Sequence, residues 1–123
     1  MSQILERFEA AVRALVDDGP VKQRLGLAYS RHLEDLQQID LPVAGKGGFN
    51  DLHAALHGVP PMGNVGSVQA SIRKMSSAEA VRHARTIVRI YAELLVIQAG
   101  PKALAEPPAK LGEGPPRYLV GGN

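Results

Sequence analysis

Apolar residues recur at helical spacing along most of this chain, and that periodicity limits the folds open to it more than any other feature. Within residues 3–16 they repeat three, four, seven and eight positions apart, which puts them on one side of an α-helix. Similar apolar stripes run through residues 20–39 and 77–99. The sequence therefore predicts an all-α fold built on three long helices over these ranges.

Turn and cap residues mark the ends of these helices. The segment Asp-Asp-Gly-Pro at residues 17–20 ends the first helix and begins the second, because proline is favoured at the first helical position. Ser76 followed by Glu79 is the pattern of a capping box at the start of the third. Periodicity also indicates two short helices, at about residues 50–57 and 65–74. We expect a small helical bundle in which the long helices pack together and the short ones lie across one end.

The segment between the second long helix and the first short one is rich in glycine. The Pro and Gly content of residues 40–48 predicts a loop, and Asn50 is expected to cap the short helix that follows. Residues 45–48, Gly-Lys-Gly-Gly, lack the spacing of a phosphate-binding loop, and no strand precedes them. We therefore interpret this stretch as an ordinary connection.

The C-terminal part of the chain differs in composition from the rest. Residues 100–123 hold five prolines and five glycines, so we divide the chain into a helical domain, residues 1–105, and an extended arm, residues 106–123. Proline restricts the backbone in advance, so such an arm can bind extended on a neighbour at low entropic cost. The side chains expected to anchor it are Tyr118, Leu119 and Val120.

Composition excludes several classes of protein. A length of 123 residues fits one domain. The chain has no cysteine, which removes disulfides, thiol catalysis and thiolate metal sites. Aromatic residues make up only 4% of it, too few to supply stacking platforms for single-stranded bases. No apolar run approaches the roughly 20 residues of a membrane span. We expect a cytoplasmic protein that carries no cofactor and does not span a membrane.

Two histidines have a spacing that metal sites use. His53 and His57 are four residues apart on the first short helix, so both rings should lie on one side of it. The glutamate of the zinc-protease motif is missing between them, and only Asp51 is near as a third ligand. We therefore predict two surface histidines and no metal site.

His32 falls within the apolar stripe of the second helix. A neutral histidine there needs a hydrogen-bond partner, which Asp35 or the hydroxyl of Tyr29 or Tyr91 could provide. These four residues are the predicted pocket. Two interpretations stay open: a pH-sensitive or catalytic histidine, or a structural one whose hydrogen bonds are satisfied.

Cations gather on and just before the longest helix. They are Arg73, Lys74, Arg82, Arg85 and Arg89. Such a stripe could contact phosphates of a nucleic acid. The alternative is a face that simply meets water, with Glu79 and Glu93 placed to neutralise the arginines.

The absence of any recognised catalytic constellation favours a function in binding. Val96 and Ile97 widen the apolar face at the end of the longest helix. We therefore predict a non-enzymatic helical assembly subunit, which self-associates or docks on a larger protein complex with the arm as part of the contact. The alternatives are a nucleic-acid-associated regulator using the arginine stripe, and a small enzyme or ligand-binding protein centred on His32.

Overall fold

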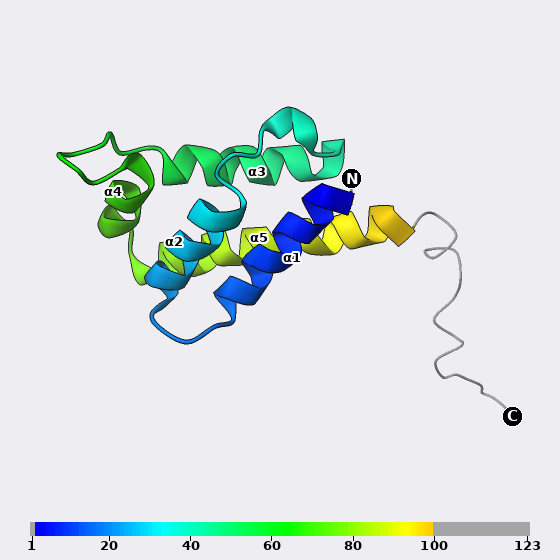
Figure 1. Ribbon diagram of the computed structural model, residues 1–123, viewed down its shortest axis with the longest axis horizontal. Coiled ribbons are helices and arrows are strands. Elements are labelled where there is room, and N and C mark those ends of the chain that lie inside the picture. Colours follow the sequence, from blue (N-terminus) through cyan, green and yellow to red (C-terminus); the bar gives the residue numbers. More distant parts are fainter. Residues whose placement is uncertain (1, 100–123) are drawn as a thin grey trace, which may run out of the picture.

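The computed structural model describes residues 2–99, and its regular elements are helices throughout (Figure 1). In chain order they are α1 (Ser2–Leu15), α2 (Val21–His32), the 3-10 turn η1 (Gln38–Asp40), α3 (Val43–Leu56), α4 (Ser67–Lys74) and α5 (Ser77–Ala99). The predicted all-α class is confirmed, and the described part of the chain contains no strand. The predicted arm, with Tyr118, Leu119 and Val120, lies outside the described residues.

The longest helix, α5, runs along most of the described part of the molecule and packs against α1, α2 and α3 (Figure 1). Its inner face buries Ile87, Ile90 and Leu94 completely or almost so. The capping box at its start is confirmed. The Glu79 amide donates to Ser76 Oγ at 3.0 Å, and the Ser76 amide donates to Glu79 Oε1 at 2.8 Å. Residues 77–99 are therefore helical over the predicted range.

The first two helices form a hairpin against α5. α1 buries most of its predicted stripe, including Phe8 and Leu15, whereas Val16 lies beyond the helix and is 75% exposed. The chain reverses after α1 through Gly19, whose φ of +106° suits glycine. The Arg24 guanidinium on α2 donates to the carbonyl oxygens of Leu15 and Gly19. Carbonyls at the end of a helix have no partner within it, so Arg24 closes the turn by supplying one.

The second helix is shorter than predicted. It ends at His32, whereas the apolar stripe predicted residues 20–39. Leu33 and Leu36 are buried although both follow the last residue of α2. The spacing of the leucines therefore does not indicate where α2 ends. The Asp40 carboxylate accepts a hydrogen bond from the backbone amide of Gln37. This local cap stabilises η1 in place of a further turn of α2.

The predicted loop at residues 40–48 is wrong over most of its length, because α3 begins at Val43. Asn50 therefore lies inside the helix and is not its cap. The glycines have a packing role: a Cβ on Gly45 would lie 3.4 Å from Ile90 Cγ2, and one on Gly48 would lie 3.3 Å from Ile90 Cδ1. Glycine at these two positions lets α3 approach α5 closely, at some cost in helix propensity.

The second of the two helices predicted to be short is α4. It begins two residues later than the predicted start of 65 and ends at Lys74 as expected. Its buried residue Ser71 accepts a hydrogen bond from the Val59 amide through Oγ at 3.0 Å, while Ser67 Oγ donates to the Val59 carbonyl at 2.7 Å. The connection from α3 to α4 is thus fixed to α4, which lies at one end of the molecule (Figure 1).

Leucine substitutions at two helical glycines test the close approach of α3 to α5. We expect Gly45→Leu to destabilise the protein by about 1–3 kcal/mol, because the new side chain meets Leu41 and Ile90 in a packed interface. Gly47→Leu is the matched control: nothing lies within 4 Å of its Cβ position, so it should be stabilising by up to about 1 kcal/mol. Urea unfolding measures both. Equal effects of the two substitutions would contradict this packing.

Candidate functional site

A buried tyrosine and a histidine meet between α2 and α3. Tyr29 on α2 is completely buried, and its hydroxyl lies 2.9 Å from Nε2 of His57, at the C-terminal end of α3. Burial, and then the negative charge of Glu34, raise the pKa of Tyr29 to about 12. The phenol therefore keeps its proton at neutral pH, and it can donate a hydrogen bond to Nε2 of a neutral His57 whose ring proton is on Nδ1.

The two histidines of α3 lie on one side of the helix, as their spacing predicts. The rings of His53 and His57 stack with centroids 4.3 Å apart. Burial, and then the neighbouring His53, lower the pKa of His57, while Glu34 acts in the opposite direction. Among residues 2–99 there is no cluster of three or more His, Asp or Glu side chains placed to hold a metal ion.

The structure gives the expected partners of His32 other contacts. The Tyr29 hydroxyl bonds His57, and the Asp35 carboxylate pairs with Arg7 of α1, whose hydrogen bond lowers the pKa of that carboxyl. His32 itself is half-buried at the end of α2, and Tyr91 is half-buried on α5. Two of the four predicted pocket residues are therefore engaged elsewhere, Tyr29 with His57 and Asp35 with Arg7.

The predicted cationic stripe lies on the surface. Arg82, Arg85 and Arg89 are exposed on α5, and Arg73 and Lys74 are exposed at the end of α4. The Glu79 carboxylate accepts the Ser76 amide, and this hydrogen bond lowers its pKa, with Arg82 contributing further. Within the described residues, neither Glu79 nor Glu93 comes within ion-pair distance of a stripe residue. Neutralisation by these glutamates is thus limited to longer-range attraction.

The second half of α5 exposes apolar side chains. Val88, Leu95, Val96 and Ile97 are each 41–44% exposed, although Leu94 beside them is buried. Val96 and Ile97 line a shallow hollow of about 300 Å³ whose surface is almost wholly apolar. These two residues, predicted to widen the apolar face, therefore lie on the surface and outside the core.

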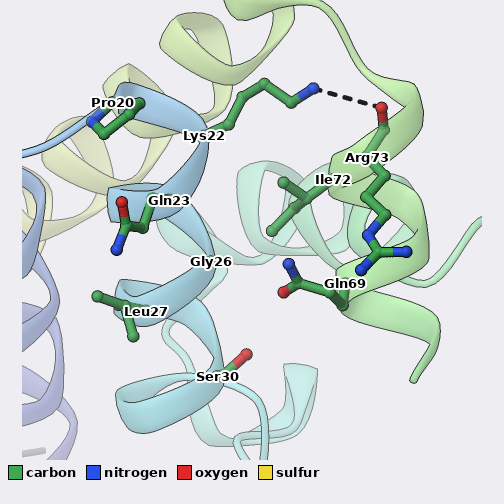
Figure 2. Close-up of a pocket in the computed structure, with 9 residues that line it drawn as sticks. All are labelled: Pro20, Lys22, Gln23, Gly26, Leu27, Ser30, Gln69, Ile72 and Arg73. Carbon is green, nitrogen blue, oxygen red and sulfur yellow. Dashed lines mark hydrogen bonds between the residues drawn. The ribbon is translucent and has the colours of Figure 1, made fainter. Parts of the chain in front are cut away.

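A groove between α2 and α4 was missed by the sequence analysis (Figure 2). Lys22, Gly26 and Leu27 line it from α2, and Ile72 and Arg73 line it from α4. Its volume is about 550 Å³. The signal that could have pointed to it is Gly26, a glycine within an otherwise helical stretch, which often marks close packing. The opposite wall is more than 40 residues away in sequence, so spacing alone could not supply it.

The lowered pKa of His57 makes stability depend on pH. In the unfolded chain the His57 ring binds a proton near pH 6.5, more readily than in the folded protein. The stability contributed by the neutral ring is therefore present above about pH 6.5 and decreases as the pH falls below that value. We expect a lower free energy of unfolding at about pH 5 than at about pH 7.5. His83, whose pKa is also lowered, chiefly by burial, adds to this decrease.

The variant His57→Gln isolates the contribution of His57, because the amide oxygen can still accept the Tyr29 hydroxyl. Its free energy of unfolding should decrease less between the two pH values than that of the wild type, when both are measured by urea denaturation. An identical decrease in the two proteins would exclude His57 as a source of the pH dependence.

Comparison with known proteins adds no relative to this picture. No protein-family model matches the chain, and no curated protein or solved structure shows significant similarity to it. No helix among residues 2–99 has both the length and the apolar character of a membrane span. The function therefore has to be argued from how the described residues are arranged.

Proposed function

We propose that this chain is a non-enzymatic helical assembly subunit, which self-associates or docks on a larger protein complex through the outer face of α5. The observation that carries the proposal is the row of exposed apolar residues on the second half of that helix. Val88, Leu95 and Val96 together leave a continuous apolar surface in water. Clustered apolar exposure of this kind is typical of protein interaction sites.

The spacing of this surface favours another helix as its occupant. Val88, Ala92, Leu95 and Ala99 are all exposed and follow one another at intervals of four, three and four residues. Two helices that pack along a seam use the same alternation of three and four. The charged residues Arg89 and Glu93 border the hollow beside this row, as polar residues commonly border the centre of an interface.

The C-terminal arm is part of the proposed contact. The arm, residues 106–123, comes after the exposed apolar row of α5 in the sequence. Its anchors, Tyr118, Leu119 and Val120, would bind extended on the same partner as Val96 and Ile97. A helix seam joined to a proline-rich arm would give the interface more area than the helix alone provides.

The arginine stripe supports a second candidate, a nucleic-acid-associated regulator. Arg82, Arg85 and Arg89 are exposed on α5, and no carboxylate lies within ion-pair distance of them in residues 2–99. Free guanidinium groups in a row can contact successive phosphates. Binding of DNA that weakens steeply with salt would favour this candidate over the assembly subunit.

Light scattering on the full chain tests the assembly role. We expect a mass above that of the monomer at high protein concentration, and a monomer for the double variant Leu95→Gln/Val96→Gln, because a polar seam no longer gains from leaving water. Deleting residues 106–123 should weaken the association. Gln98→Glu, an exposed change on the same helix, is the matched control and should associate like the wild type.

Circular dichroism of each variant verifies that the helices remain folded. If the wild type stays monomeric, docking on another protein is tested by pull-down from a cell extract. The proteins retained by the wild type are compared with those retained by the Leu95→Gln/Val96→Gln variant. A monomer whose retained proteins are unchanged by the double variant would contradict the proposed role of α5.

A further inference from the structure

The groove between α2 and α4 has an apolar floor formed by a close contact of the two helices. A Cβ on Gly26 would lie 3.0 Å from Ile72 Cδ1, so the glycine lets the α4 side chain reach the α2 backbone. Leu27, 39% exposed, continues this apolar surface along α2. The groove therefore offers contact area to an apolar side chain of a ligand, within a volume typical of binding sites.

The polar residues of the groove are cations and amides. The Lys22 ammonium donates to the Arg73 carbonyl oxygen at 3.3 Å, which holds it at one end of the groove (Figure 2). This bond uses one of its three protons. The Arg73 guanidinium lies on the α4 wall beside Gln69, away from the Lys22 ammonium, and Gln23 adds a second amide from α2 (Figure 2). No carboxylate lines the groove, so its two positive charges lack a negative partner there.

These features point to a ligand that is negatively charged and partly apolar. An arginine side chain binds a carboxylate through two parallel hydrogen bonds, and an ammonium elsewhere in the groove can attract a second carboxylate without fixing its geometry. A small anion such as phosphate would satisfy the cations and leave the exposed side chain of Leu27 uncovered. An extended peptide with acidic and apolar side chains would cover the cations and Leu27 together, because the residues that line the groove follow α2 from Pro20 to Ser30.

We propose that the α2–α4 groove binds an acidic, extended segment of another protein, with carboxylates on Arg73 and on Lys22 and an apolar side chain over Leu27. The groove lies at the α4 end of the molecule, whereas the exposed apolar row lies on the second half of α5, toward the opposite end (Figure 1). The proposal is therefore independent of the assembly role of α5, and each can fail without the other.

Nuclear magnetic resonance of the ¹⁵N-labelled full chain tests the groove, with the peptide acetyl-Asp-Glu-Leu-Asp-Glu-amide as the probe. We expect saturable shifts at the backbone amides of Gln23, Gly26 and Gln69, weaker in added salt. Arg73→Glu should weaken peptide binding at least about tenfold, because it removes the carboxylate partner and adds a repelling charge. Arg85→Glu, the same change at an exposed position on α5, should leave peptide binding unchanged.

Two further measurements keep the test decisive. Arg73→Gln and Lys22→Met remove charge without reversing it, and they replace Arg73→Glu if that variant loses its helical structure. Inorganic phosphate, added at the same concentration of negative charge as the peptide, should give smaller chemical-shift changes that are confined to residues near Arg73. The proposal is overturned by an absence of shifts at millimolar peptide, by equal loss of binding in Arg85→Glu and Arg73→Glu, or by phosphate shifts that match those of the peptide.

Discussion

Burial of one face of α5 against three other helices is the interaction on which the rest of this structure depends. Ile87, Ile90 and Leu94 are removed from water by contacts with α1, α2 and α3. Burying side chains of this size contributes roughly 1.5–3 kcal/mol each. Helices as short as α1 and α2 have little stability alone, so they persist because they bury their apolar stripes against each other and against α5.

The sequence predicts well the helices whose ends are determined by residues close to them in the chain. The start of α5 is set by Ser76 and Glu79, two residues that bond each other's backbone, and its predicted range matches the structure. The start of α3 depends on tertiary contacts. Gly45 and Gly48 have the composition of a loop, and only the presence of Ile90 opposite them explains why they lie in a helix. The sequence of one segment does not indicate which residue of a distant helix will pack against it.

The candidate sites show the same division. The exposure of the α5 arginines and the shared side of His53 and His57 follow from helical spacing. The contact between Tyr29 and His57 joins residues 28 positions apart, and the predicted partner of Tyr29 was His32, on its own helix. The α2–α4 groove likewise exists only once two distant helices meet. Periodicity assigns a residue to a face of its helix, whereas the identity of the facing residue depends on the packing of the whole bundle.

The inner face of α5 organises the fold, and its outer face is the surface that we propose for recognition. Native-state hydrogen exchange tests the role of the inner face most directly, because it measures the opening free energy of each amide. Amides of Ile87, Ile90 and Leu94 should exchange only by global unfolding, with opening free energies equal to the global value from denaturant, while those of residues 57–66 open at lower free energy. Opening of α5 at a free energy below that of α1 and α2 would contradict its central position.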